Sequence, residues 1–303
     1  MKLPKKVIGE LVVRPGSKAR LAARSTSGTD LDRFGPTERA SAKEIAERDL
    51  EEFKRELGPA QELLYASDNW AVLVVLQGLD ASGKDGTIKH VLSGVNPQGC
   101  QIVAFGEPSA VELQHDYLWR CVRALPERGR IGIFNRSYYE DVLVVRVHPE
   151  LLEAHRLPPE KPSGHLLWEE RFEDINGFER HLVRNGTRVV KVFLHLSKDE
   201  QRRRFLKRLD DPAKQWKFSL SDLRDRPFFD AFQDAYEEMI TATSSPWAPW
   251  YVVPADHKPA MRALVGGIIV DAIDGLDLRI PPVDDQKLAV IDQARHLLDA
   301  EPD

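Results

Sequence analysis

The sequence predicts an α/β protein with three α/β/α layers, in which one parallel sheet lies between two layers of helices. From Trp70 onward, short apolar runs alternate with helical segments. This alternation is typical of a parallel sheet with helices on both faces. Residues 71–76 are wholly apolar, as expected for a strand that is buried on both faces. A chain of 303 residues, 42% of them hydrophobic, is long enough to bury one large core.

Five strands are predicted, at residues 71–76, 102–105, 131–134, 189–196 and 250–253. The helices between and after them are predicted at residues 84–93, 112–125, 168–184, 198–209, 220–243 and 259–275. Another helix, at residues 41–65, precedes the first strand and carries an apolar stripe of Ile45, Leu50, Phe53 and Leu57. We expect the Gly58-Pro59 pair to break or kink that helix.

Three units follow from composition. Residues 1–40 are rich in Lys, Arg, Ser, Gly and Pro and are expected to form a partly extended N-terminal arm. Residues 41–280 form the main domain, and residues 281–303 form a tail with a short helix at 286–298. A polar excursion at 148–164 carries four prolines. Because it follows a candidate site, we predict a lid at about residues 146–170 rather than surface padding.

The charge balance argues against a general nucleic-acid binder. The chain has 43 Lys and Arg against 48 Asp and Glu, a net charge of -5, so any anion site must be local. No stretch approaches the ~18 apolar residues of a membrane span, and no signal peptide is recognisable. The two cysteines, Cys100 and Cys121, form no metal or redox motif and are expected to be reduced in a cytoplasmic protein.

A glycine-rich turn between the first strand and the next helix fits the phosphate-loop pattern G-x-x-x-x-G-K (Walker A), from Gly78 to Lys84. Backbone N–H groups of such a loop point at phosphate oxygens, the helix N-terminus adds positive potential, and the lysine adds a full charge. A chance glycine turn is the alternative, and the strand–turn–helix context argues against it. The predicted phosphate-binding residues here are Gly78, Ala81, Ser82, Gly83, Lys84, Asp85 and Gly86.

Two acids make this loop unusual. Asp85 stands where the usual loop has the Ser or Thr that binds magnesium, and Asp80 lies inside the loop. A carboxylate among phosphates repels them unless a cation lies between, so we predict that Asp80 faces the metal. The alternative is that Asp80 only caps the turn or the helix.

A second polar cluster follows the strand at 131–134. Asn135 stands where related kinases often place a carboxylate, and Arg136 can grip phosphates with its planar fork. Open parallel sheets bind ligands at this end of their strands. Glu140 and Asp141 are predicted to bind metal or to orient the acceptor. The alternative for both acids is a solvated helix start.

The third feature is a basic window. Residues 184–226 hold 13 Lys and Arg against 6 Asp and Glu. On the helix at 198–209, we expect one basic face and one core-facing apolar side. The basic face is Arg204, Lys207 and Arg208, and the core side is Phe205, Leu206 and Leu209. A basic face is usually only solvated. Here its position favours an anion track longer than one nucleotide requires, and aromatic platforms for nucleic acid are not evident.

Three stretches together resemble the family-2 polyphosphate kinases: GLDASGKDGTIKHVLSGVNPQGC, GRIGIFNRSYYEDVLVVRVHPE and DDPAKQWKFSLSDLRDR. The resemblance runs from about Lys43 to Leu276. It implies a phosphate-loop kinase fold of the thymidylate-kinase type, with a five-stranded parallel sheet between helices and a helical lid. It also implies phosphoryl transfer between inorganic polyphosphate and nucleotides. Asn135-Arg136-Ser137 in place of Asp-Arg-Ser resembles the class III subgroup, whose members phosphorylate nucleoside mono- and diphosphates.

The resemblance also implies site roles and partners. Lys84 and its loop hold the reacting phosphates, Asp80 lies on the metal side, and Arg136 and the arginines at Arg203 and Arg208 line the polyphosphate path. The metal is magnesium, with manganese as an alternative, and Glu140 is assigned to the metal or to acceptor alignment. The expected partners are polyphosphate and adenine nucleotides, with guanine as an alternative. A homodimer or homotetramer is expected, with no nucleic acid or membrane.

Two other functions are compatible with the sequence. An ATP-dependent nucleoside monophosphate kinase shares the loop and the fold, although Asp85 and the arginine track argue against it. A non-catalytic polyphosphate-binding protein would retain the polymer without turnover. In the favoured mechanism, the acceptor oxygen attacks the terminal phosphorus in line, and the protein positions the groups and neutralises charge.

Overall fold

One mostly parallel sheet organises the protein. The computed structural model describes residues 2–31, 33–34, 40–161, 164–216 and 221–301. Within these residues, six strands follow the order β1-β6-β5-β2-β4-β3. Their bounds are β1 Val12–Val13, β2 Ala71–Gln77, β3 Cys100–Ala104, β4 Ile131–Asn135, β5 Thr187–His195 and β6 Trp250–Pro254. The three-layer α/β prediction is confirmed, and the five predicted strands are the five parallel ones.

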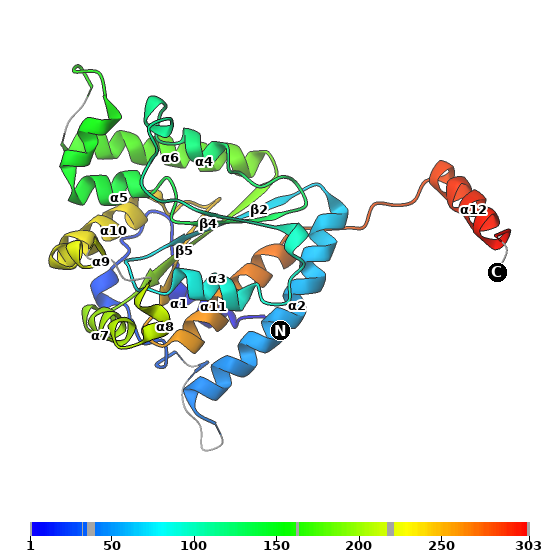
Figure 1. Ribbon diagram of the computed structural model, residues 1–303, viewed down its shortest axis with the longest axis horizontal. Helices are drawn as coiled ribbons and strands as arrows, with labels where there is room; N and C mark the ends of the chain where they lie inside the picture. The colour runs from blue at the N-terminus through cyan, green and yellow to red at the C-terminus, as the bar shows by residue number, and fades with distance from the viewer. Residues whose placement is uncertain (1, 32, 35–39, 162–163, 217–220, 302–303) are drawn as a thin grey trace.

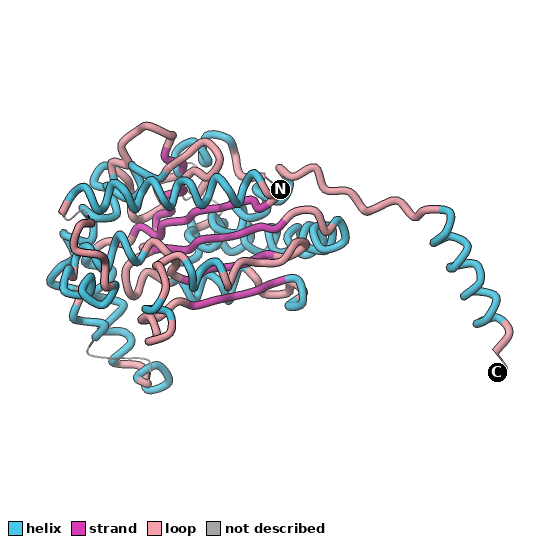
Figure 2. The backbone as a smooth tube through the Cα atoms, turned by 90° about the horizontal axis from the view of Figure 1, so that it is seen from above, coloured by secondary structure: helices cyan, strands magenta, loops and turns pink. Residues whose placement is uncertain are grey.

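Helices cover both faces of the sheet (Figure 1). One face carries α1 Lys5–Leu11, α2 Ala42–Ser67, α3 Lys84–Val91 and α11 Lys258–Asp274. The other carries α4 Trp119–Val122, α5 Glu140–Val147, α6 His165–Arg184 and α10 Phe229–Thr243. Figure 2 shows the strands between these layers. The remaining helices are α7 Lys198–Leu209, α8 Pro212–Gln215, α9 Ser221–Arg224 and α12 Asp285–Asp299. The 3-10 turns are η1 Leu21–Ala23, η2 Pro97–Gly99, η3 Glu112–Gln114, η4 Pro149–His155 and η5 Arg226–Phe228.

The central strand β2 is buried on both faces, which explains its unbroken apolar run. Val72, Val74 and Leu76 pack into the core under α2 and α11. Leu73 and Val75 point the other way, into the core under α5, α6 and α10. Since side chains alternate along a strand, a strand that is covered on both faces must be apolar at every position. The loop after β2 therefore starts from a rigid, doubly buried element.

The N-terminal segment differs most from expectation. It was expected to be a partly extended arm, and the structure shows that it begins with α1 and then β1, which pairs antiparallel with the edge strand β6. Leu3, Val7 and Leu11 are all buried against the core at a helical spacing of four residues. The helix was not predicted because the basic composition of the segment indicated an extended arm. The strand β1 was not predicted because two residues are too few to show a period. Whether residues 1–40 and 281–303 behave as separate units stays a prediction.

Three helix predictions differ in detail. The helix at 41–65 is not broken: α2 runs through Pro59, with Leu57 and Leu64 buried on either side of it. The helix at 112–125 is divided into η3 and α4, because the Asp116 carboxylate accepts the N–H of Leu118 in a turn. The helix at 220–243 is divided into α9, η5 and α10. Its first residue lies outside the described part of the chain, as do residues 217–219 of the third family-like stretch.

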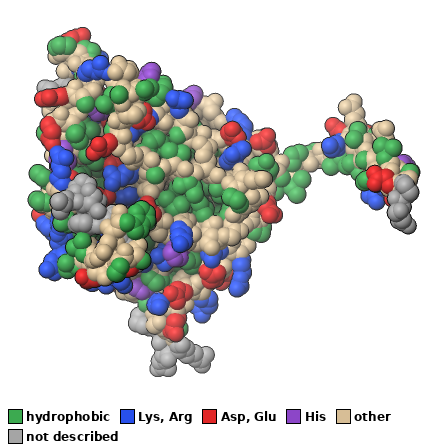
Figure 3. All heavy atoms as spheres, in the orientation of Figure 1, with side chains coloured by type: hydrophobic (Ala, Val, Ile, Leu, Met, Phe, Trp, Pro, Cys, Tyr) green, Lys and Arg blue, Asp and Glu red, His purple; other side chains and the backbone are tan. Residues whose placement is uncertain are grey.

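The C-terminal helix α12 stands away from the rest of the protein on an extended linker (Figures 1 and 2). Every residue of α12 is exposed. Figure 3 shows hydrophobic side chains along both the linker and the helix, and Ile280 and Val283 of the linker are 72% and 52% exposed. Among the described residues, none of the helices is long and apolar enough to cross a membrane.

These burial patterns predict opposite effects of the two terminal deletions. Removing residues 280–303 should leave the melting temperature unchanged, because this segment buries no side chain in the described structure. Removing residues 2–13 should lower it by about 10 °C or more, since Leu3, Val7, Leu11 and Val13 leave the core. Thermal unfolding followed by circular dichroism measures both. Equal stability of the two deletion proteins would contradict this description of the N-terminal segment.

Candidate active site

The phosphate loop joins β2 to α3 where the strand order reverses, because the chain next crosses to β3 on one side and later to β5 on the other. Such switch points are where open α/β sheets bind ligands. A Cβ at Gly78 would lie 2.8 Å from the Ser82 hydroxyl and 3.1 Å from the Leu194 carbonyl oxygen, so only glycine fits. Gly83 and Ala81 have φ values of 106° and 64°. The left-handed alanine stores backbone strain, which the surrounding contacts must hold in place.

Lys84 lies folded over this loop. Its Nζ donates to the carbonyl oxygen of Gly78 at 2.6 Å and to that of Leu79 at 3.3 Å. The side chain is buried, and burial together with the charge of Arg136 lowers the pKa of Lys84. The ammonium group is thus held inside the concavity by the carbonyls of the loop, where a phosphate could replace them as its partner.

Arg136 joins the loop to the end of β4. Its guanidinium binds the Asp80 carboxylate through Nη2 at 2.7 Å and the Glu140 carboxylate through Nη1 at 3.3 Å. The two acids, Glu140 first, raise the pKa of Arg136 despite its burial. Asp80 does not cap α3, whose N-cap is Gly83 and which has no side-chain cap. The structure therefore brings Asp80, Arg136 and Glu140 together, as the sequence predicted.

The two unusual residues of the motifs face each other. Asn135 Nδ2 donates to Asp85 Oδ1 at 2.7 Å, across from β4 to the first turn of α3. An aspartate at position 135 would place a second carboxylate against Asp85, and like charges at this distance repel. The amide at position 135 and the acid at position 85 therefore form a matched pair.

The oxygen atoms around Arg136 suit a divalent cation. Magnesium in kinases is usually held by one or two carboxylates together with substrate phosphates, and Asp80 and Glu140 supply two. Asn135 Oδ1 is buried and has no hydrogen-bond partner among the described residues, which is typical of a group that meets water or an ion. In the described part of the chain, no group of three or more His, Cys, Asp or Glu side chains forms a metal cage. Substrate oxygens would have to complete the coordination.

Asp141, the other candidate acid of this motif, makes a different contact. Its carboxylate is buried and lies 3.4 Å from Nε2 of His155 in η4. Burial raises the pKa of Asp141 to about 7. Asp141 therefore contacts the segment that was predicted to be a lid, whereas Glu140 binds Arg136. Residues 162–163 of that segment lie outside the described structure.

The basic helix α7 clamps the loop from the side. Arg204, expected on a basic face, is instead buried, and its Nη1 donates to the carbonyl oxygens of Ala81 at 2.9 Å and Ser82 at 2.8 Å. Its Nη2 reaches the carbonyl oxygen of Asp256 after β6, at 3.1 Å. Gln201 Nε2 adds a bond to the Asp80 carbonyl oxygen at 3.1 Å. Sequence reasoning missed these loop contacts, because arginine is a residue type normally found at the surface.

The rest of α7 is more exposed than expected. Phe205 is buried as predicted, but Leu206 and Leu209 are 45% and 38% exposed, so their prediction as core residues is wrong. Arg203 is exposed and pairs with Glu200. Arg208 is half-buried, with its guanidinium 5.7 Å from the centre of the Phe205 ring. The polyphosphate contacts expected of Arg203 and Arg208 remain predictions.

A cavity at the carboxyl end of β3 was not predicted from the sequence. It has a volume of about 570 Å³ and begins at the end of β3, residues 103–106. Trp119 and Arg123 line its other side. The His115 ring stacks on Trp119 with the centroids 3.9 Å apart. Because Ala104 in β3 pairs with Asn135 in β4, this cavity and the phosphate loop lie at the same edge of the sheet.

Comparisons with known proteins agree with this geometry. The family described as Polyphosphate kinase 2 (PPK2) matches residues 40–280. An ADP-polyphosphate phosphotransferase of Rhodopseudomonas palustris is 55% identical over 225 residues, 74% of this chain and 78% of the relative. An AMP/ADP-polyphosphate phosphotransferase of Meiothermus ruber is 46% identical over 255 residues, 83% and 91% of the two chains. The crystal structure of polyphosphate kinase 2 from Arthrobacter aurescens TC1 superposes with a TM-score of 0.81 at 35% identity, covering 96% and 97% of the two chains.

The Arg204 clamp predicts how the loop responds to mutation. An Arg204→Met substitution should raise amide hydrogen exchange in residues 78–84 by about tenfold or more, since hydrogen bonds to a charged group contribute about 1.5–3 kcal/mol. Hydrogen-exchange mass spectrometry of that segment measures the effect. The neighbouring Arg203→Met variant is the matched control, because the exposed Arg203 side chain pairs with Glu200 of its own helix rather than with the loop. Equal exchange in both variants would mean that Arg204 does not hold the loop.

Proposed function

The chain belongs to the polyphosphate kinase 2 family, and from this premise we propose that it transfers the terminal phosphoryl group of inorganic polyphosphate to nucleoside mono- and diphosphates. AMP becomes ADP, and ADP becomes ATP. The observation that carries the proposal is the convergence of Lys84 and Arg136 on one phosphate loop. The name of the Meiothermus relative, which covers most of this chain, includes both AMP and ADP.

Phosphoryl transfer asks the protein for position and charge rather than for covalent chemistry. The loop amides and Lys84 bind the phosphates, and Arg136 neutralises charge that spreads over the transferred group. The acceptor oxygen attacks the phosphorus in line with the departing polymer. The segment at about 146–170 is proposed as a lid that excludes water, which would otherwise take the phosphoryl group.

The family is a kinase family and implies a divalent metal. We assign it as magnesium, with manganese as an alternative, and we assign Asp80 and Glu140 as its protein ligands. When bound, the ion neutralises negative charge on the phosphates. Both carboxylates are also bound by Arg136. Binding of a cation by Asp80 therefore competes with that ion pair, and a phosphate is the natural new partner for the guanidinium.

The cavity at the end of β3 is proposed to take the acceptor nucleotide. It is large enough for a base, and the Arg123 guanidinium, which lies over the Trp119 ring 4.8 Å from its centre, offers a flat surface on which a base can stack. The stacked His115–Trp119 pair stiffens that wall. Because the cavity opens at the same sheet edge as the phosphate loop, a nucleotide held there can direct its phosphate toward Lys84. Adenine nucleotides fit the names of the relatives, and guanine nucleotides remain an alternative.

A basic cluster near the loop supports binding of a polymer rather than of a single nucleotide. Lys258 lies close to Arg204, Arg262 and Lys207, and the nearby acid is Glu200. Partial burial and then the charges of Arg204 and Arg262 lower the pKa of Lys258 to about 8. The cations outnumber this acid, so they repel one another, and a bound anion reduces the repulsion. A polyanion is the ligand that relieves this repulsion, and a homodimer or homotetramer remains the expected assembly.

Donor choice tests the proposed function directly. Purified protein is incubated with ADP and magnesium and with either polyphosphate or a second nucleoside triphosphate, GTP, as the donor, and ATP is measured. A parallel reaction uses AMP as the acceptor, with polyphosphate or ATP as the donor. We expect product with polyphosphate for both acceptors. Transfer to AMP from ATP alone would instead support an ATP-dependent monophosphate kinase.

A matched variant separates catalysis from binding in the same assay. Lys84→Ala should lower turnover by about 10² or more, the scale seen when a key electrostatic donor is lost. Retention on immobilised polyphosphate by a wild-type protein that never forms product would support a non-catalytic binding protein. A Lys84→Ala protein with near-normal activity would overturn the role of this lysine.

The lowered pKa of Lys258 predicts proton uptake on polyphosphate binding. A polyanion favours the charged amine, so the pKa of Lys258 rises from about 8 in the complex, and near pH 8.5 binding takes up a proton. Affinity should therefore fall as pH rises through this range. Titration calorimetry in two buffers of different ionisation enthalpy counts the protons. Lys258→Met should abolish the uptake, whereas Lys287→Met on α12 should keep it. Uptake that is the same in Lys258→Met would assign the proton elsewhere.

A further inference from the structure

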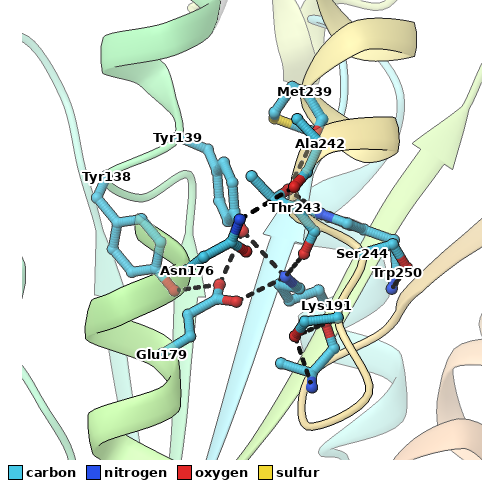
Figure 4. A network of polar contacts seen from close by, with 12 residues as sticks. Tyr138, Tyr139, Asn176, Glu179, Lys191, Met239, Ala242, Thr243, Ser244 and Trp250 are labelled. Carbon is cyan, nitrogen blue, oxygen red and sulfur yellow. Dashed lines mark hydrogen bonds and ion pairs between the residues drawn. The ribbon is translucent and has the colours of Figure 1, made fainter. Parts of the chain in front are cut away.

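A fully buried ion pair joins α6 to β5 in the core of the protein. Glu179 and Lys191 are both 0% exposed, and Lys191 Nζ lies 2.6 Å from Glu179 Oε2 (Figure 4). Lys191 Nζ also donates to the carbonyl oxygen of Thr243 at the end of α10, at 2.6 Å. All hydrogen-bonding capacity of this ammonium is used, because its third contact is the hydroxyl of Tyr139 at 3.0 Å. The charge is therefore fully compensated inside the protein.

The other half of this network consists of two tyrosine hydroxyls. Tyr138 and Tyr139 both donate to Glu179 Oε1, at 2.9 and 2.7 Å. Both rings are fully buried, and burial followed by the charge of Glu179 raises their pKa values well above 10. The hydroxyls consequently remain protonated donors. Figure 4 shows the side chains of Tyr138, Tyr139, Glu179 and Lys191 converging from three elements.

These tyrosines lie between the two residues that meet at the candidate site, Arg136 and Glu140. Arg136 has a left-handed backbone with a φ of 66°, which is strained for a residue with a Cβ. Its N–H continues the β ladder to the carbonyl oxygen of Leu76 at 3.1 Å. Ser137 Oγ then accepts from Gln77 Nε2 at 3.1 Å and from the N–H of Tyr139 at 3.2 Å. The turn is thus fixed at the strand and again at the tyrosines.

Stability alone does not account for such a pair. The cost of removing two charges from water often exceeds their mutual attraction, and apolar replacements of a buried ion pair are often neutral or stabilising. A buried pair of this kind instead fixes the orientation of the groups that it binds, because its hydrogen bonds are made in one geometry only. Here those groups are the hydroxyls of Tyr138 and Tyr139, on the turn that carries Arg136.

We propose that Glu179 and Lys191 are positioning residues for phosphoryl transfer, which act through Tyr138 and Tyr139 to fix the strained turn and so the guanidinium of Arg136. Neither residue touches substrate. Glu179 binds the tyrosine hydroxyls on the core side of the turn. The Arg136 guanidinium extends from the same turn to Asp80 of the phosphate loop. This inference rests on the proposed function. It adds a constraint on the backbone of Arg136 to the ion pairs that its guanidinium makes with Asp80 of the loop and with Glu140.

The test removes the hydroxyl and keeps the ring. Tyr139→Phe leaves the edge contact with Trp250 in place and deletes the one group that contacts both Lys191 and Glu179. With polyphosphate and ADP, we expect kcat to fall by about tenfold or more, because small displacements of a catalytic group cost about that much. The KM for ADP should change by less than about twofold, since Arg136 is assigned to the polyphosphate rather than to the acceptor ADP. Tyr138→Phe, which loses one contact to Glu179 only, should have the smaller effect.

A second variant addresses the ion pair itself. Glu179→Gln with Lys191→Met removes both buried charges and the hydrogen bond from Lys191 to Tyr139, and leaves one uncharged amide oxygen as the acceptor of both tyrosine hydroxyls. We expect this double variant to stay folded and to lose kcat in the same way as Tyr139→Phe. Asp49→Asn is the matched control. Asp49 is also fully buried and pairs with Arg33 at 2.6 Å, but it belongs to α2, and its ion pairs within the described residues are with Arg33 and Arg48, which lie outside the site. It should lower the melting temperature and leave kcat unchanged.

The outcomes separate this inference from the proposed function. Every rate is measured at a temperature where circular dichroism shows each variant folded. A wild-type protein without polyphosphate turnover contradicts the proposed function. An active wild type together with a Tyr139→Phe protein that keeps its kcat within about twofold contradicts the positioning role, whether or not the double variant folds. A fall in kcat for Asp49→Asn equal to that of Tyr139→Phe would likewise show that lost stability, not position, lowers the rate.

Discussion

The contact of Arg136 with two carboxylates is the constraint on which the active site depends. Through Asp80 it holds the phosphate loop, and through Glu140 it holds the first turn of α5, so one guanidinium joins β2, β4 and α5. Lys84 is occupied in the same manner by carbonyl oxygens of the loop. Both cations are therefore compensated by acceptors within the protein. Phosphates can take the place of these acceptors without rearrangement of the core.

Rigid elements hold this arrangement from two directions. From the side, Arg204 of α7 binds the carbonyl oxygens of Ala81 and Ser82, which stabilises a loop with a left-handed alanine. From below, the Glu179–Lys191 pair meets the tyrosines that follow Arg136. Electrostatic catalysis is effective when donors are fixed before the reaction, because no reorganisation is then needed. Arg204, Glu179 and Lys191 are the buried polar groups that fulfil this requirement in the proposed mechanism.

Sequence alone predicts the parallel strands and the meeting of Asp80, Arg136 and Glu140, because an apolar run marks a buried strand and parallel strands end at one edge. It did not predict the burial of Arg204, whose residue type indicates the surface, nor β1, which is too short to show a period. Asp85 and Asn135 each stood out, but only the fold shows that they pair. Glu179 and Lys191 did leave a signal: an acid at a core-facing position of one amphipathic helix and a lysine inside an apolar strand. Opposite charges at two core positions favour a buried pair.

The position of Arg136 in a crystal structure of the protein with polyphosphate and magnesium is the decisive measurement. In the structure described above, its Nη2 lies 2.7 Å from the Asp80 carboxylate. With both ligands bound, we expect the guanidinium to leave Asp80 and to bind phosphate oxygens, while Tyr138 and Tyr139 keep their hydrogen bonds to Glu179. A complex in which Arg136 still binds Asp80 and makes no contact with phosphate would contradict this expectation.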